Sequence, residues 1–171
     1  MLLSRGRTVF IADTTVHELP TSVELADIAI QAAAMARQMG HEPRVGLVSY
    51  STFGNSTHVT SDNIRGAVSL LDSRELDFEY DGEMTVDVAM NMEQMANYPF
   101  CRLTGPANVL VVPARHSASI STKLMQEMAG ATVIGPILTG IDESIQICST
   151  TSTASDILNM AVLAAAKIGH P

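Results

Sequence analysis

The chain has 171 residues, a formal net charge of −8, 46% hydrophobic residues and only 16% charged residues. This is the composition of a globular domain with a large buried fraction, and it argues against disorder. The ten Lys and Arg residues form no cluster, which disfavours a nucleic-acid partner. No apolar run approaches the roughly 20 residues that span a bilayer, and the N-terminus lacks a secretory signal pattern. With only Cys101 and Cys148 present and no CxxC, we expect a cytoplasmic protein with free thiols and no membrane partner.

The first half of the chain predicts alternating strands and helices. Arg7–Ala12 is a strand candidate. Thr21-Ser22-Val23-Glu24 has the form of a capping box, and it opens a helix that ends near Gly40, a residue suited to the left-handed position after a helix. The other elements predicted in this half are a strand at 44–50, a helix at 62–71 after a Thr60 or Ser61 cap, and a short strand and turn at 78–83.

The stretch from Pro106 to Asp142 organises the second half. Ala107–Val112 is an apolar run, rich in valine and too short for a typical helix, as expected of a strand buried on both faces. A polar turn at Arg115–Ser119, a helix ending near Gly130 and a strand at Ala131–Ile134 complete a predicted βαβ unit. Because open α/β sheets bind ligands beyond the carboxyl ends of their strands, this turn is the first place to expect a site.

The remaining segments complete an alternating pattern. Residues 84–100 predict a short helix, 144–148 a last strand, and Thr153–Asp156 a second capping-box start for a final helix at 157–168. The final helix is almost entirely apolar from Met160 to Ala166, so we expect an oligomer or a companion domain to bury it. The whole pattern predicts one α/β unit, a three-layer α/β/α fold with a mostly parallel sheet.

Metal sites find little support in the residue spacing. The five histidines show no HxxxH spacing, and no CxxC motif occurs. Asp81, Glu83 and Asp87 lie close together and could hold a hard cation through oxygen ligands. Acidic clusters in an acidic protein are more often solvated faces or helix caps, so we expect no metal in this chain.

Two hydroxyl-rich helix starts could hold phosphate through backbone N–H groups and the helix dipole. One is Ser117-Ala118-Ser119, with Arg115 and His116 beside it, and the other is Ser149–Thr153. Ordinary helix caps explain both without a ligand, and from spacing alone that interpretation is favoured. No GxxxxGK[ST] or GxGxxG loop occurs. The histidine beside serines could suggest nucleophilic catalysis, but with no GxSxG elbow we expect no triad.

Several blocks, in order along the chain, resemble the phosphate acetyl/butyryl transferase family. They are FIADTTVHELPTSVELADIAIQAA, RVGLVSYSTFGNS, YDGEMTVDVAM, NVLVVP, SISTKLMQEMAGATVIGPILTG and SDILNMAVLAA. The resemblance runs from about Gly6 to Ile168 and implies a phosphate acetyltransferase-like fold, with residues 1–171 as the C-terminal part of such a domain and a front segment missing. Within the family, NYPFCRLTGPANVLVVPARHSASISTKL is similar to the transferase-like region that ends bacterial hybrid NADP-dependent malic enzymes.

The chain departs from the transferase pattern before its last helix. Transferases of the family carry Ser-Arg-Gly there, with a catalytic, phosphate-facing arginine, whereas this chain has Ser149-Thr150-Thr151. Asp156 falls on the family's acid a few residues later. Other departures from the family's Asp-Leu and Gly-Asn pairs are at Ala114, Arg115, Ala118 and Ser119. Because losing one preorganised donor typically costs about 10²–10³ in rate, the resemblance implies that this chain alone does not catalyse acetyl transfer.

The resemblance implies a regulatory and oligomerising domain of an enzyme that oxidatively decarboxylates malate to pyruvate. Its NADP and divalent metal (Mg or Mn) sites would lie in a catalytic domain of the same polypeptide, outside this chain, which would need no cofactor of its own. The transferase-like cleft would bind acetyl-CoA or a related acyl-CoA as an effector, and the domain would self-associate. The candidate ligand contacts are Ser149, Thr150, Asp156, Arg115, His116, Ser117, Ser119 and Lys123.

Two other functions stay open. One is an active phosphate acetyltransferase, which converts acetyl-CoA and phosphate to acetyl phosphate and CoA, with its front half elsewhere. Ser149 and Asp156 favour this function and Thr150 opposes it. The other is a purely structural dimerisation module with a vestigial cleft. Binding of acetyl-CoA distinguishes the regulatory domain from the structural module, and formation of acetyl phosphate identifies the transferase.

Overall fold

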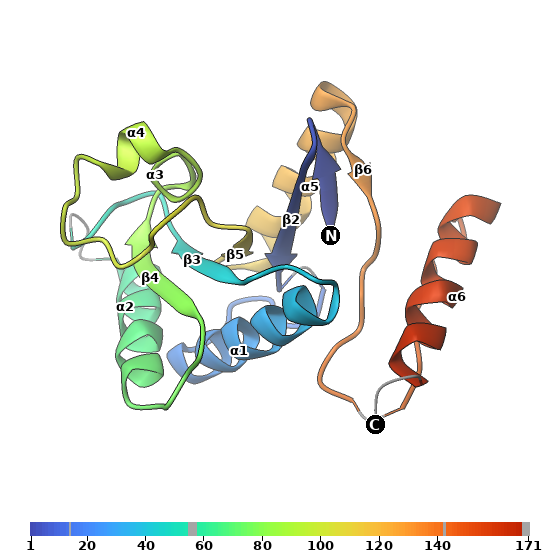
Figure 1. Ribbon diagram of the computed structural model, residues 1–171, viewed down its shortest axis with the longest axis horizontal. Coiled ribbons are helices and arrows are strands. Elements are labelled where there is room, and N and C mark those ends of the chain that lie inside the picture. The colour runs from blue at the N-terminus through green and yellow to red at the C-terminus, as the bar shows by residue number, and fades with distance from the viewer. Residues whose placement is uncertain (14, 55–57, 142, 169–171) are drawn as a thin grey trace.

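A six-stranded sheet in the order β4-β3-β5-β2-β1-β6 organises the fold (Figure 1). The computed structural model describes residues 1–13, 15–54, 58–141 and 143–168. The strands are β1 Leu2–Ser4, β2 Arg7–Ala12, β3 Arg44–Val48, β4 Glu79–Met84, β5 Val109–Val111 and β6 Thr132–Val133. From β4 to β2 every pairing is parallel, whereas β1 pairs antiparallel with both β2 and β6. The predicted mostly parallel sheet is therefore confirmed.

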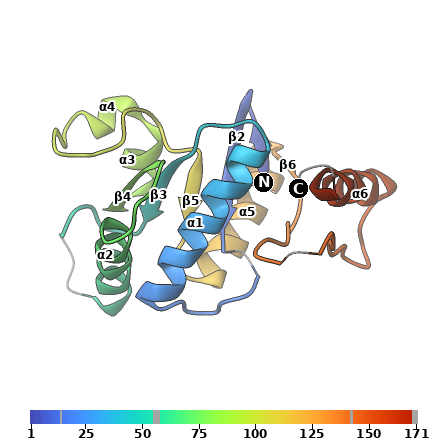
Figure 2. The same ribbon diagram turned by 60° about the horizontal axis from the view of Figure 1, so that its bottom comes forward.

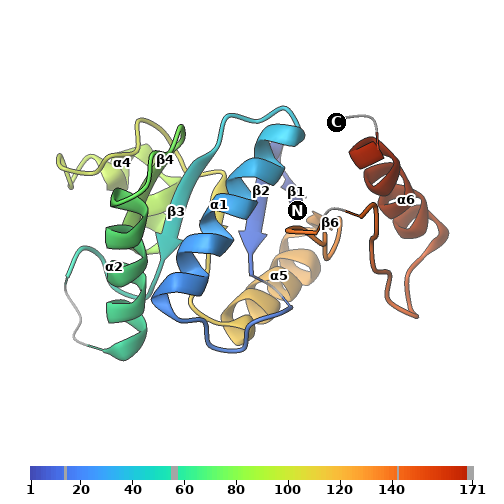
Figure 3. The same ribbon diagram turned by 90° about the horizontal axis from the view of Figure 1, so that it is seen from below.

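Helices cover both faces of the sheet, as the three-layer prediction requires. The helices are α1 Ser22–Gln38, α2 Val59–Asp72, α3 Val86–Met90, α4 Met92–Met95, α5 Arg115–Ala129 and α6 Ala154–Ile168. One hydrophobic core joins α1 and α2 to one face of the strands, and a second core joins α3, α4 and the buried Ala118 of α5 to the other. Seen from below, α1 and α2 lie in front of the strands (Figure 3). Neighbouring side chains of β5 alternate between the two cores, as strand geometry demands.

Local signals explain α1 well. The backbone N–H of Thr21 donates to the Glu24 carboxylate at 2.7 Å, and the N–H of Glu24 donates to Thr21 Oγ1 at 3.4 Å, which confirms the capping box. The buried face of α1 is rich in alanine, so the helix packs close to its neighbours. At Gly66 of α2 an added Cβ would lie 2.4 Å from Ser22 Oγ and 3.0 Å from Ser22 Cβ, so a larger residue would require Ser22 to move where the two helices meet.

Helix α2 begins earlier than predicted. Its N-cap is His58, whose ring accepts a hydrogen bond from the N–H of Thr60. The expected caps, Thr60 and Ser61, lie inside the helix. The Ser61 side chain is fully buried and its hydroxyl lies 3.3 Å from Ser49 Oγ, so it packs against the end of β3 and cannot cap the helix.

One prediction for the central unit was wrong. Residues 115–119 form the first turn of α5, because Ala114 is extended and its carbonyl accepts from the N–H of Ala118 at once. The predicted strand, helix and strand of the βαβ unit are present as β5, α5 and β6, and β2 and β1 lie between its two strands. The unpredicted β1 lies between β2 and β6, and it folds back on β2 through a tight turn at Arg5 and Gly6, both with positive φ.

The C-terminal segment differs most from the prediction. Residues 144–148 form no strand, and Ile145 and Ile147 are 52% and 57% exposed. The side-chain amide of Gln146 takes the place of a ladder by bonding both the N–H and the carbonyl of Leu138. Helix α6 stands apart from the sheet (Figures 1 and 2), with Met160 buried and most of its other apolar side chains exposed. The expected cover over this apolar helix stays a prediction. In the described part of the chain, no helix is long and apolar enough to cross a membrane.

Candidate functional site

The loops after β2 and β5 meet where the path of the chain diverges. From β2 the chain runs through α1 to β3, and from β5 it runs through α5 to β6 in the opposite direction. Open α/β sheets bind ligands at such a topological switch point. Arg115 spans it, since its backbone N–H donates to the Glu18 carbonyl at 3.3 Å and its guanidinium lies 3.4 Å from the Glu18 carboxylate.

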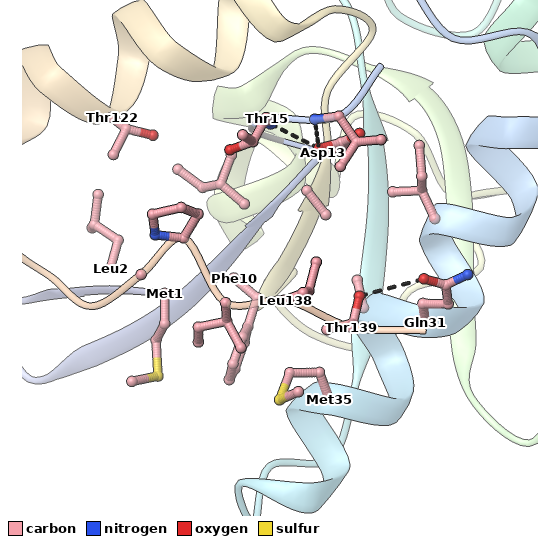
Figure 4. A pocket seen from close by; sticks show the side chains of 18 of the residues that line it. Met1, Leu2, Phe10, Asp13, Thr15, Gln31, Met35, Thr122, Leu138 and Thr139 are labelled. Carbon is pink, nitrogen blue, oxygen red and sulfur yellow. Dashed lines mark hydrogen bonds between the residues drawn. The ribbon is translucent and has the colours of Figure 1, made fainter. Parts of the chain in front are cut away.

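A cavity of about 730 Å³ opens beside this point, between α1, α5, β2 and the segment 133–140 (Figure 4). Helix α1 contributes the apolar side chains of Ile28, Ala32 and Met35 beside the polar ones of Glu24, Asp27 and Gln31. The facing side of α5 is polar, with side chains spaced three or four residues apart on one helix face. These polar side chains are Ser119, Thr122, Lys123 and Gln126. A lining that combines apolar side chains with a few polar groups is usual for a small-molecule site.

Asp13 organises the loop that borders this cavity. Its carboxylate accepts hydrogen bonds from the backbone N–H groups of Thr15, Val16 and His17 at 2.8–3.0 Å and from His17 Nδ1 at 2.8 Å. The other ring nitrogen of His17, Nε2, lies 3.7 Å from the Glu24 carboxylate. Burial is the largest influence on the pKa of Asp13 and raises it, but the hydrogen bonds together outweigh burial and lower the pKa. The predicted site did not include Asp13 or His17, although Asp13 directly follows β2.

Acidification is expected to release this loop. Because the pKa of Asp13 is lower in the folded than in the unfolded state, its contribution to stability is fully present above the unfolded value of about 3.9. The contribution is lost as the pH falls through the lower, folded value. We expect an NMR titration of the Asp13 carboxyl to move together with the amide signals of residues 15–17. Asp13→Asn should flatten the pH dependence of stability below about pH 4, and an unchanged slope in this variant would contradict the assignment.

A second, smaller cavity of about 240 Å³ adjoins the first. It lies between α5, the segment 147–152 and the first turns of α6, and polar groups dominate its wall. The two cavities adjoin along shared lining residues, and together they are called the α5–α6 cleft below. The shared residues are Gln126, Val133, Ile134, Gly135 and Ile147.

The α5–α6 cleft unites half of the predicted ligand contacts. Ser149 and Asp156 line its smaller part, and Ser119 and Lys123 line its larger part. The other predicted contacts do not line the cleft: they are Arg115, which pairs with Glu18, and the exposed His116, Ser117 and Thr150. The cause is the early start of α5, which places residues 115–117 on the outer side of its first turn.

Asp156 also caps α6. Its carboxylate accepts from the N–H of Thr153 at 2.8 Å and from the Thr153 hydroxyl at 2.7 Å, and these bonds lower its pKa. Ser149 Oγ lies 2.9 Å from Thr151 Oγ1. Thr151 lines the cleft, whereas Thr150 does not. The hydroxyl-rich start is therefore an ordinary helix cap as well as one wall of the cleft.

The acidic residues Asp81, Glu83 and Asp87 have structural roles in the fold. Asp81 accepts from the backbone N–H of Arg102 at 2.8 Å, and Glu83 pairs with Arg65 at 2.7 Å. Asp87 lies in the first turn of α3. Within residues 1–13, 15–54, 58–141 and 143–168, no three His, Cys, Asp or Glu side chains are grouped to hold a metal ion.

This fold, with a cleft walled by α5 and the start of α6, is that of a phosphotransacetylase-like domain. The chain belongs to the phosphate acetyl/butaryl transferase family, whose family model matches residues 1–165. It is 58% identical over 167 residues to the NADP-dependent malic enzyme of Rhizobium meliloti (strain 1021), covering 98% of this chain and 22% of that protein. It is also 37% identical over 157 residues to the phosphate acetyltransferase of Clostridium acetobutylicum, covering 91% of this chain and 47% of that protein.

Solved structures agree with the fold. A phosphotransacetylase from Streptococcus pyogenes matches with a TM-score of 0.93 and 30% identity over 99% of this chain and 53% of that one. The EutD phosphotransacetylase from Staphylococcus aureus matches with a TM-score of 0.91 and 26% identity over 97% of this chain and 52% of that one. The chain therefore spans about half of these proteins and 22% of the malic enzyme, in which it corresponds to the C-terminal transferase-like part.

Proposed function

We propose that this chain is the C-terminal regulatory domain of an NADP-dependent malic enzyme and binds acetyl-CoA or a related acyl-CoA in the α5–α6 cleft. The 58% identity to a malic enzyme supports the parent enzyme. The regulatory role rests on one observation, that Ser149 and Asp156 line the cleft together, and on Thr150, which stands where the resemblance to the transferases implies an arginine. The cleft thus keeps a ligand wall without the cation that acetyl transfer requires.

The chemistry of the cleft suits an acyl-CoA. The pantetheine arm is slender and uncharged, and its amide groups and methylene groups suit a cavity lined by both polar and apolar side chains. The acids of the larger cavity already have partners, since Asp27 pairs with Arg74 at 2.8 Å and Asp13 holds His17. Lys123 has no ion-pair partner in the described part of the chain, and it is placed to meet a phosphate of the ligand at the exposed rim.

The remaining parts of the proposal lie outside this domain. The NADP and Mg or Mn sites belong to the catalytic domain of the same polypeptide, which oxidises malate in the cytoplasm. Acetyl-CoA affects that domain if its affinity differs between two states of the assembly. An exposed apolar stripe on α5, formed by Ile120, Leu124 and Met128, offers a surface for self-association.

Calorimetric titration of the purified protein with acetyl-CoA tests the proposal. We expect saturable binding at micromolar strength, about −8 kcal/mol. Ser149→Ala should weaken binding about tenfold, because one hydrogen bond to a ligand is worth about 1 kcal/mol or somewhat more. Ser117→Ala is the matched control, since this exposed serine of α5 lies outside the cleft. Absence of binding at millimolar acetyl-CoA would refute the sensor role.

A second function has its own support. Ser149 and Asp156 share one cavity, and the chain is 37% identical to a phosphate acetyltransferase. An active transferase would convert acetyl-CoA and phosphate to acetyl phosphate and CoA. Acetyl phosphate formed by the wild-type polypeptide at a rate typical of enzymes, about 1–10³ per second, would favour this function over the regulatory one.

A further inference from the structure

Three aromatic side chains meet at the surface beside β4, in a chain with only four Phe, three Tyr and no Trp. The ring centroids of Phe53 and Phe100 lie 4.9 Å apart, those of Phe53 and Tyr98 5.4 Å, and those of Tyr98 and Phe100 6.1 Å. Tilted and edge-to-face rings at these separations attract one another. Phe53 and Tyr98 pack on the second hydrophobic core, whereas Phe100 is 64% exposed. These three residues are called the aromatic cluster below.

Other exposed apolar side chains flank the aromatic cluster along the chain. Met92 on α4 and Val86 at the start of α3 are about half exposed. Residues 90–101 contain three methionines and a single charged residue, Glu93. Aromatic residues and methionine are enriched at the buried centres of protein–protein interfaces, and charged residues are depleted there. This surface therefore has the composition of an interface.

The aromatic cluster is held on a fixed platform. The N–H of Phe53 donates to the Glu83 carbonyl at 2.8 Å, although Phe53 has a φ of 48°, where a bulky residue is rare. The N–H of Arg102, two residues after Phe100, donates to the buried Asp81 carboxylate at 2.8 Å. Because both segments are fixed to β4, a partner that docks on the rings has little ordering entropy to overcome.

The relatives of the chain indicate which partner this is. Tyr98 and Phe100 belong to the block NYPFCRLTGPANVL, which within the family is similar to the malic enzymes. The chain is 58% identical to a malic enzyme but covers only 22% of it, so most of such a polypeptide lies outside this domain. A part of the same polypeptide has a high effective concentration, so even a small surface can hold it.

We propose that the catalytic part of the same polypeptide docks on the aromatic cluster. The proposal rests on the parent enzyme proposed above. Helices α3 and α4 lie at the end of the molecule away from α6, so the docked part leaves α6 free (Figure 1). The apolar stripe on α5, with Ile120, Leu124 and Met128, also stays available for self-association.

The position of the aromatic cluster connects docking with the α5–α6 cleft. The hydrophobic core on which Phe53 and Tyr98 pack also contains Ala118 of α5. Helix α5 forms one wall of the cleft. A ligand that shifts α5 therefore acts on the same packed core as the docked catalytic part.

Photo-crosslinking in the full polypeptide tests the docking surface. The probe p-benzoylphenylalanine replaces Phe100 and keeps an aromatic ring there. We expect mass spectrometry to find crosslinks to peptides of the catalytic part. The same probe at Ala34, an exposed position of α1 on the other face of the sheet, is the control and should give no such crosslinks. Crosslinks from position 100 only to this domain of a second copy, or none at all, would overturn the proposal.

Two substitutions distinguish docking from ligand binding in the full polypeptide. Phe100→Ser removes the apolar ring, whereas Phe100→Leu keeps an apolar side chain. We expect Phe100→Ser to bind acetyl-CoA with the wild-type affinity but to lose the change in malate oxidation that acetyl-CoA causes, and Phe100→Leu to keep that change. Full regulation in Phe100→Ser would contradict the docking role. The crosslink needs no acetyl-CoA, so it decides the docking surface even if the sensor role is refuted.

Discussion

Replacing Arg65 by alanine is expected to lower the free energy of unfolding by about 3 kcal/mol, near the lower end of the range for breaking a buried ion pair. Glu83 is fully buried, and Arg65 Nη1 lies 2.7 Å from its carboxylate. The hydroxyl of Ser51 donates to Glu83 at 2.6 Å and the N–H of Gly54 at 3.3 Å, so the loop after β3 depends on the same carboxylate. The variant leaves that carboxylate buried without its cation. A third of the Arg65 side chain is exposed, which places the loss at the lower end.

The matched control is Arg74→Ala. Arg74 Nη1 lies 2.8 Å from the Asp27 carboxylate, close to the distance between Arg65 and Glu83, but both of these side chains are well exposed. Exposed pairs contribute only about 0–1 kcal/mol. Urea unfolding of the two variants measures the difference, and equal losses would show that burial of Glu83 does not matter. Adding Glu83→Gln to Arg65→Ala should recover part of the loss, because the buried charge is then removed.

Thr150→Arg is expected to raise acetyl phosphate formation by the full polypeptide about 10²–10³-fold, the effect typical of one preorganised donor at developing charge. The substitution recreates the Ser-Arg pair that the transferase pattern has before α6. Thr150 lies next to Ser149, whose side chain lines the cleft. Thr150 itself is exposed in a turn, so the long arginine side chain has room to bend toward the cleft.

Thr150→Gln distinguishes the effect of positive charge from the effect of side-chain length. Glutamine extends nearly as far as arginine but carries no positive charge, so it should leave the rate unchanged. Initial rates of acetyl phosphate formation from acetyl-CoA and phosphate give the comparison. If acetyl-CoA binds and Thr150→Arg still forms no acetyl phosphate, the residue at position 150 does not by itself decide transferase activity.

The parts of the fold that local chemistry determines could be predicted from the sequence. The reciprocal bonds of Thr21 with Glu24 and of Thr153 with Asp156 need only residues three apart, so both helix starts were recognisable. The apolar runs of β3 and β5 showed strands buried on both faces, because a parallel sheet covered by helices requires them. The positive φ of Gly40 and Gly130 likewise follows from local helix termination.

Pairings between distant segments could not be predicted from the sequence. Strand β1 has only three residues, and it is a strand because it pairs with β2 and β6. No local sequence pattern reveals these pairings. Residues 144–148 have strand-forming side chains but lack a partner strand, so propensity alone misled the prediction. Ser119 and Lys123 line the larger cavity and Ser149 and Asp156 line the smaller one, and their role as ligand contacts stays a prediction. The roles of Asp13 and His17 depend on a loop conformation that spacing does not encode.

The shortness of β6 has a consequence for motion. This strand is two residues long and attaches to the sheet through β1, so little backbone hydrogen bonding holds the segment that leads to α6. Such edges open locally at a small fraction of the free energy of global unfolding. A ligand that contacts both α5 and the start of α6 would suppress this opening while the two hydrophobic cores stay unchanged. Effector binding would then slow proteolysis after residue 133. The segment would detach from the sheet less often, although the average structure of the domain would stay the same.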